Sequence, residues 1–211
     1  MLTKCDLSRQ LRLKILHRDE IEWTNLHLNS LGSHADISPA DVQLRGVIYG
    51  GTECSQGTLF IKIDDHGTKC PVRTRDLYAR GGPGTSPKGQ RRFCQLNFDL
   101  VYPCGWSFSI FGAEYKGHVS LHGDSTASFK TTYYFSGETD QATSTVDFKG
   151  PTSEHFSKHN VIAWDTWSPC GSTQTMLNVK QEVNVHGACK LASMSVGGRF
   201  GHIVLLKWRR C

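Results

Sequence analysis

The sequence predicts an all-β protein: an antiparallel, jelly-roll-like β-sandwich stapled by disulfides, with an irregular or partly helical N-terminal extension. Three observations support this prediction. Short segments of alternating apolar and polar residues follow one another from residue 42 onward, as is typical of strands with one buried face. Turn residues separate them at strand-length intervals, which favours a sandwich or barrel over a parallel α/β sheet. Eight cysteines among 211 residues indicate disulfides in an exported domain.

The length and composition limit the class of protein further. A chain of 211 residues can bury a sizeable core without help from a metal. The cysteines include no C-x-x-C pair and are too scattered for a zinc-finger layout. No apolar run approaches the roughly 20 residues of a membrane span, so no membrane segment is expected. We predict no cofactor and no metal site, and we expect a monomer.

Residues 1–40 are predicted to be an N-terminal extension and linker, separate from a domain over residues 41–211. Residues 7–28 could form a helix with a ragged apolar stripe, and in residues 29–41 Ser, Gly and Pro follow one another closely, as is typical of a linker. Charged residues interrupt every apolar run near the N-terminus, so no signal peptide is visible in this chain.

The strands are expected in the domain that follows. Their predicted ranges are 42–49, 57–64, 95–102, 106–110, 118–122, 128–136, 142–150, 177–185 and 202–208. The clearest is 95–102, in which Leu96, Phe98, Leu100 and Tyr102 alternate with mostly polar residues. The sequence Pro-Cys-Gly at 103–105 joins it to the next run, which predicts a hairpin; a loop crossing between sheets is the alternative. The last range, 202–208, is apolar on both faces and suits an interior strand.

A basic, glycine-rich stretch is the most suggestive candidate for binding. Between residues 69 and 92, seven Lys or Arg residues face one acidic residue, Asp76. Arginine side chains and free backbone N–H groups could hold phosphate or an acidic polysaccharide there. The candidate residues are Arg80, Lys88, Arg91 and Arg92. A solvated loop is the simpler interpretation and is preferred, because the stretch lacks the residue order of a nucleotide-binding loop. A smaller basic cluster, at residues 207–210, closes the chain.

Two tryptophans form a second candidate for binding. Trp164 and Trp167 are three residues apart, just before Cys170. If exposed, their rings could stack on sugar rings, whereas packing in the core is the commoner use of such residues. Nucleic acid is not an expected partner, because no recognised motif is present and the net charge of +5 is modest.

Several short motifs have a simpler structural explanation than a catalytic or metal-binding one. His155 and His159 would share a face of a helix, as zinc binding needs, but the segment is expected to be a solvated loop between strands. The pair Asp64-Asp65 and the stretch 122–125 (His-Gly-Asp-Ser) are each expected to form turns rather than a calcium site or a catalytic triad.

Acidic residues in or beside the strands leave one catalytic possibility open. Asp99, Glu114 and Glu138 are candidates for the paired carboxylates of a glycoside hydrolase, but the sequence gives no distances between them.

Several blocks of sequence, in order and with their spacing, carry a resemblance to a known family. They are GVIYGGTECSQGT, GGPGTSPKGQRRFCQLNFDLVYP, GWSFSIFGAEYKGHVSL, TYYFSG, WSPCG and LLKWRRC. Through them, residues from about 42 to Cys211 resemble the fungal secreted family catalogued as domain of unknown function 4360. The resemblance implies a small exported β-protein whose biochemical activity is not established.

The resemblance also implies a pattern of four cysteines. It pairs Cys54 with Cys94 and Cys170 with Cys211, and each bond would close a loop of about 40 residues, worth roughly 4 kcal/mol of stability. The extra residues Cys5, Cys70, Cys104 and Cys189 have no implied partners. Residues 1–40 stand where the family carries a signal peptide. The preferred hypothesis is a mis-predicted first exon that is not part of the mature domain; the alternatives are export by an unconventional route and retention inside the cell.

We therefore predict a small secreted β-sandwich protein that binds, without catalysis, at a cell wall or host surface. Its expected location is extracellular, and its expected partner is a cell-wall polysaccharide or a host protein. One alternative is a secreted effector that binds or inhibits a host enzyme through its loops. A second is an uncharacterised hydrolase, which two acids, or a histidine and an acid, converging in a cleft would favour.

Overall fold

The computed structural model describes residues 38–52, 54, 57–74, 77–171, 175–187, 192–196 and 201–211, with the backbone course alone for 192–196. The expected helix over residues 7–28, most of the expected linker, and Cys5 and Cys189 lie outside the described residues. None of the described helices is long and apolar enough to cross a lipid bilayer.

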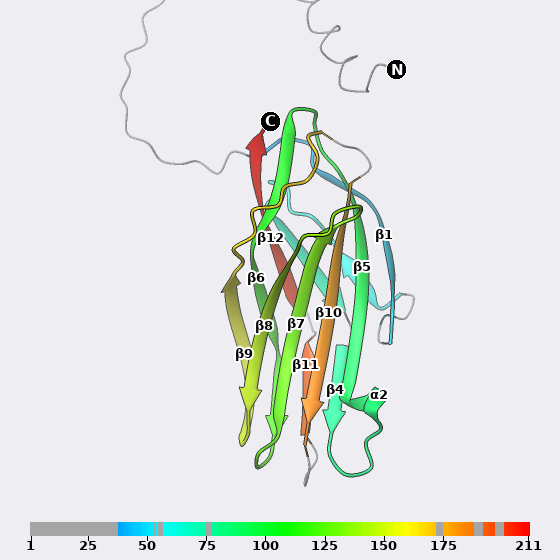
Figure 1. Cartoon of the computed structure of the whole chain (residues 1–211), viewed down its shortest axis with the longest axis vertical. Coiled ribbons are helices and arrows are strands. Elements are labelled where there is room, and N and C mark those ends of the chain that lie inside the picture. Colours follow the sequence, from blue (N-terminus) through cyan, green and yellow to red (C-terminus); the bar gives the residue numbers. More distant parts are fainter. Residues whose placement is uncertain are drawn as a thin grey trace, which may run out of the picture. The chain divides into compact units, whose positions relative to one another are not determined.

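Among the described residues, strands make up almost all of the regular structure. They are β1 (Gln43–Gly51), β2 (Leu59–Ile61), β3 (Lys69–Thr74), β4 (Leu77–Gly81), β5 (Arg91–Val101), β6 (Trp106–Leu121), β7 (Thr126–Phe135), β8 (Gln141–Lys149), β9 (Thr152–Val161), β10 (Met176–His186), β11 (Ala192–Val196) and β12 (His202–Arg210), with the short helix α2 (Pro87–Gln90) before β5. Sheet A has the order β1-β5-β10-β7-β8, and sheet B has the order β2-β3-β12-β6-β11-β4 with β9 on the free side of β6 (Figure 1). All pairings are antiparallel, so the predicted all-β sandwich is confirmed.

The core lies between the inner faces of the two sheets. On β5, Leu96, Phe98 and Leu100 are fully buried, as their alternation with polar residues predicts. Rings from the two sheets meet edge to face across the core, for example Phe108 of β6 and Phe135 of β7 with centroids 5.3 Å apart. The strand β12 lies between β3 and β6, which confirms its predicted interior position.

The predicted hairpin around Pro103-Cys104-Gly105 is wrong. Strand β5 belongs to sheet A and β6 to sheet B, so this turn crosses between the layers. Gly105 supplies the left-handed conformation that the turn needs, with φ at 81°. Two amphipathic runs can either pair side by side or face each other across a core, and alternation alone does not separate these cases. Here they face each other, since the rings of Tyr102 and Phe108 meet 5.4 Å apart.

Strand β9 corrects a second expectation. The segment around His155 and His159 is not a solvated loop, because it pairs with β6 over ten residues, from Leu121↔Thr152 to Gly112↔Val161. Only Phe156 on this strand is fully buried, so the segment shows little of the apolar alternation that marks a strand. The sequence also does not predict strands β3 and β4, because their basic residues make these segments resemble a charged loop.

The expected turns are present. The backbone N–H of Gly67 donates to the Asp64 carbonyl (3.0 Å), and the Asp64 carboxylate accepts from the backbone N–H groups of Thr68 (2.7 Å) and Lys69 (2.9 Å). The backbone N–H and the hydroxyl of Ser125 both donate to the carbonyl of His122. These bonds use the polar groups of both motifs to close turns.

Two disulfides between residues that the structure describes cross-link the sandwich. They join Cys54 to Cys94 and Cys170 to Cys211, with Cα–Cα distances of 5.6 and 6.0 Å, which is the pairing that the resemblance implies. Cys70 is a free thiol buried on β3. Burial, and then the nearby Asp64 charge, raise the pKa of Cys70 to about 12, so this thiol stays protonated and unreactive.

Candidate functional site

The structure disperses the basic candidates over several surfaces. Arg80 is exposed on the outer face of sheet B, and Lys88 is exposed on α2. Arg91 and Arg92 are neighbours on β5 and therefore point to opposite sides of sheet A. The Arg91 guanidinium donates to the Glu182 carboxylate, with Nε to Oε1 at 2.9 Å. The four residues therefore do not form one cluster.

The two tryptophans have different environments. Trp164 is buried, its ring lies parallel to that of Phe135 at 5.1 Å, and its Nε1 donates to Asp140 at 3.1 Å. Its faces are thus used in packing. Hydrogen bonds from Thr166, and then from Trp164, hold the pKa of Asp140 below its usual value.

Trp167 is half-buried and lies against two cations, Lys207 at 5.2 Å and Arg209 at 4.2 Å from the ring centroid. Two residues of the C-terminal basic cluster, Lys207 and Arg209, therefore make cation–π contacts with Trp167. This group lies at the C-terminal end of β12, whereas α2 with Lys88 lies at the other end of the sandwich (Figure 1).

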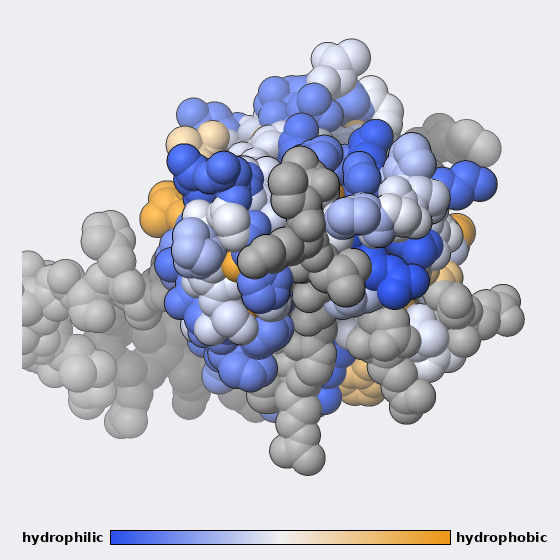
Figure 2. All heavy atoms as spheres, turned by 90° about the horizontal axis from the view of Figure 1, so that it is seen from below, coloured by the Kyte–Doolittle hydropathy of each residue, from blue (hydrophilic) through white to orange (hydrophobic). Residues whose placement is uncertain are grey.

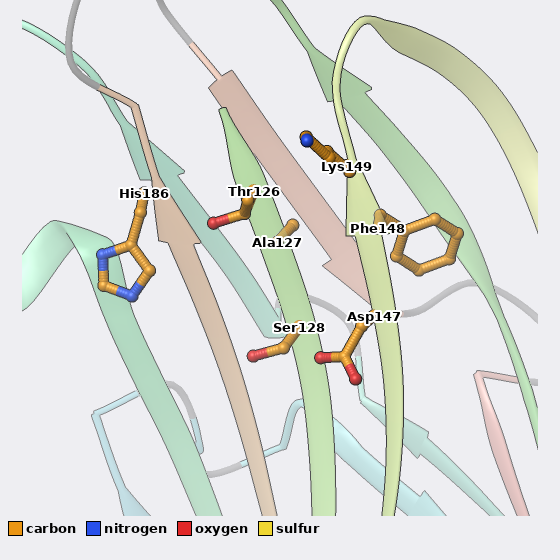
Figure 3. Close-up of a pocket in the computed structure, with 7 residues that line it drawn as sticks. All are labelled: Thr126, Ala127, Ser128, Asp147, Phe148, Lys149 and His186. Atoms are coloured by element: carbon orange, nitrogen blue, oxygen red, sulfur yellow. The ribbon is translucent and has the colours of Figure 1, made fainter. Parts of the chain in front are cut away.

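A hollow lies on the outer face of sheet A, where β10 ends. It has a volume of about 380 Å³. The polar side chains that line it are Thr126 and Ser128 of β7, Asp147 and Lys149 of β8, and His186 of β10. Figure 3 shows these side chains around the strands, with the Phe148 ring on the other side of β8 from Asp147. Seen from this end, most of the visible described surface is hydrophilic (Figure 2).

The strand register explains why these five residues meet. His186, Thr126 and Lys149 form one row across β10, β7 and β8, and Ser128 and Asp147 lie in the next row. Their chain neighbours Ala127 and Val185 are buried, so the alternation of each strand turns the polar residues outward. The hollow is therefore built on rigid strands rather than on loops.

Ordered polar side chains continue from the hollow along the same face. The Glu182 carboxylate is almost fully buried, between the Arg91 guanidinium and the Lys180 ammonium, which is 2.8 Å from it. Burial would raise the pKa of Glu182, but hydrogen bonds from Lys180 and Arg91 hold it below its usual value. Further along, the Asn178 amide accepts from Asn97 and donates to Ser136.

The lining side chains of the hollow do not have the arrangement of a Ser-His-Asp triad or of a carboxylate pair. Ser128 lies on the central strand, with His186 and Asp147 on the strands to either side, so the two flanking backbones are roughly 10 Å apart. A catalytic triad needs the histidine between the serine and the acid. Asp147 is the one carboxylate among the lining residues, whereas glycoside hydrolysis uses two.

Two of the acids considered as a catalytic pair, Asp99 and Glu114, lie on the outer faces of different sheets. Asp99 is on the outer face of sheet A, where it is 2.7 Å from Arg45, and Glu114 is on the outer face of sheet B. Within the part of the chain that the structure describes, no group of three or more His, Cys, Asp or Glu side chains could hold a metal ion.

Sequence reasoning did not find the hollow. The sequence predicts strands at 128–136 and 142–150, so it indicates that their polar residues point outward. It does not indicate the register between β10, β7 and β8, because that register joins residues up to about 60 positions apart.

Comparisons with known proteins point to a secreted family and do not identify a ligand. The sequence matches the family described as "Domain of unknown function (DUF4360)" over residues 40–211. A relative described as "Uncharacterized secreted protein", from Arthroderma benhamiae, is 34% identical over 180 residues, which are 82% of this chain and 73% of that protein.

A solved structure, TmCBM61 in complex with beta-1,4-galactotriose, matches 80% of this chain and 91% of its own. Its sequence identity is 10% and its TM-score is 0.29. A TM-score this low supports no conclusion about a shared fold. The assignment of the sandwich fold therefore depends on the strand pairing alone.

Proposed function

This chain belongs to the DUF4360 family, and we propose that it is a secreted, non-catalytic protein that binds a neutral cell-wall polysaccharide at the hollow on sheet A. The secreted description of the Arthroderma relative supports export. The two disulfides also support it, since such bonds persist in oxidising compartments and are rare in the cytosol.

The observation that carries the proposal is the mixture of hydrogen-bonding groups around the hollow. Lys149 donates, Asp147 accepts, and the hydroxyls of Thr126 and Ser128 do both. Sugar hydroxyls also donate and accept, so each can be paired there. Hydrogen bonds that involve a charged group contribute about 1.5–3 kcal/mol, which is more than neutral ones contribute.

The size and position of the hollow suit a segment of a longer chain. A volume of about 380 Å³ is at the small end of the range for ligand pockets. The hollow opens onto the outer face of sheet A, where Lys130 and Thr145 occupy the next outward row beyond Ser128 and Asp147. A polymer could therefore extend beyond the hollow without meeting a wall formed by the described strands.

Depletion of the protein by insoluble polysaccharides tests the proposal. Purified protein is incubated with chitin, β-glucan, mannan and cellulose, and the unbound fraction is measured. We expect at least one polymer to retain the protein, and Asp147→Ala or His186→Ala to weaken retention about tenfold, as expected for the loss of one good hydrogen bond.

The matched controls are Asp165→Ala and His159→Ala, since both residues are exposed and lie outside the hollow. Retention should also survive high salt, because a neutral polymer has no charge for salt to screen. The proposal is wrong if no neutral polymer retains the protein, or if the hollow variants and the control variants bind equally well.

A further inference from the structure

Two histidines face each other across neighbouring strands of sheet B. In the pairing of β6 with β9, His118 lies directly opposite His155. Their ring centroids are 4.8 Å apart and the ring planes meet at 60°. Val119 and Phe156, their chain neighbours, are buried, so both imidazoles point to the outer face of the sheet. His155 is exposed and His118 is half-buried, so the pair is open to solvent.

The pairing differs from the one that the sequence suggests. On a strand, His155 and His159 are roughly 13 Å apart along the chain, because each residue advances about 3.3 Å. Metal ions bind imidazole nitrogens at about 2.0–2.1 Å, so two ligating nitrogens must come within a few ångströms of each other. The rings of His118 and His155, with centroids 4.8 Å apart, are close enough for one metal ion to reach a nitrogen of each, whereas those of His155 and His159 are not.

We propose that His118 and His155 form a surface site for a divalent transition-metal ion of the Cu²⁺, Ni²⁺ or Zn²⁺ class. Neutral imidazole is a preferred ligand for all three ions. The two rings project from paired backbones whose register is fixed by ten residue pairs. The protein therefore supplies two ligands in a set arrangement, and water or a ligand from outside completes the coordination.

The groups around the pair predict a modest affinity. Lys116 lies two residues before His118 on the same face, and its positive charge opposes a bound cation. Glu114 lies opposite His159 and is four residues from His118, too far to serve as a third ligand. A site with two protein ligands and several open positions exchanges its metal readily. Affinity should follow the general order in which Cu²⁺ binds more tightly than Ni²⁺ or Zn²⁺.

Calorimetric titration of the purified full chain with CuCl₂ or NiCl₂, in a buffer that does not bind metals, tests the site. We expect His118→Gln and His155→Gln each to weaken, at least about tenfold, one binding event seen in the parent protein. The double variant should bind no more weakly than either single variant, because losing one ligand already destroys the site.

His159→Gln is the matched control, since His159 lies on the same strand and the same outer face. His118→Thr and His155→Thr, which suit a strand, replace the glutamine variants if those fold poorly. Thermal unfolding provides a second readout, because Ni²⁺ should raise the melting temperature of the parent and of His159→Gln but not of the paired-histidine variants. Equal affinity in the parent and in both paired-histidine variants would overturn the proposal.

Discussion

At the scale of single residues, His202 shows how a titratable group is accommodated in the core. It is fully buried, and its ring stacks on Tyr115 with centroids 5.1 Å apart. The Gln181 amide nitrogen, 2.7 Å from Nδ1, can only donate, so Nδ1 accepts and the ring proton is on Nε2. Nε2 then donates to the Tyr133 hydroxyl at 2.9 Å. Both ring nitrogens are thus satisfied by the neutral form.

This arrangement predicts how stability depends on pH. Burial lowers the pKa of His202 from 6.5 to about 3. As the pH falls from 6.5 towards 3, His202 is protonated in the unfolded chain but stays neutral in the folded protein. The free energy of unfolding therefore decreases. Each such proton contributes a slope of about 1.4 kcal/mol per pH unit.

Urea denaturation of the parent and of His202→Gln across this pH range measures the effect. We expect the variant to be less stable at neutral pH, but its stability should fall less steeply with acidification. Parallel curves for the two proteins would show that His202 is not the group responsible.

At the scale of secondary-structure elements, β9 shows where a strand departs from the usual sequence pattern. It lies beside β6 with most of its side chains exposed, and its one fully buried ring, Phe156, packs 4.8 Å from Phe148 of β8. The Asn160 amide reaches across to sheet A, where it donates to the Ser144 hydroxyl (2.8 Å) and the Thr145 carbonyl (3.0 Å). Together these contacts tie the β9 end of sheet B to β8.

The role of Phe156 in holding β9 can be measured. We expect Phe156→Ala to lower the free energy of unfolding by about 3 kcal/mol, because a buried aromatic ring is lost and leaves a cavity. Ser157→Ala, at the next and exposed position, should change it by less than about 0.5 kcal/mol. Guanidinium denaturation of both variants gives the comparison. Near-zero values for both would mean that the segment is the solvated loop that the sequence suggested.

The elements also show which strands the sequence alone can predict and which it cannot. Alternation located β5, β7, β8 and β10 because each buries one face and exposes the other. It missed β9, where nearly every side chain is polar. It could not show whether β5 and β6 pair or face each other, since both arrangements bury the same alternate residues. The hollow and the paired histidines depend on strand register, which links distant segments and leaves no local pattern.

At the scale of the whole molecule, the two outer faces of the sandwich have different chemistry. The outer face of sheet A carries the hollow and the ion pairs of Glu182. The outer face of sheet B carries the pair His118 and His155. The disulfides join β5 and the last residue, Cys211, to neighbouring loops, and so stabilise the scaffold that presents both faces.

Because the two faces are separate, loss of one proposed activity should leave the other unchanged. The double variant Asp147→Ala/His186→Ala should still bind Ni²⁺, and His155→Gln should still be retained by the polysaccharide.

The location of bound sugar tests the central claim most directly. Amide hydrogen exchange is measured on the native protein, alone and with soluble oligosaccharides of glucose, N-acetylglucosamine, mannose or galactose. We predict that at least one of them slows exchange in the segments that line the hollow, residues 126–128, 147–149 and 186, and leaves β6 and β9 unchanged. Protection by none of these sugars, or protection confined to sheet B, would contradict the account.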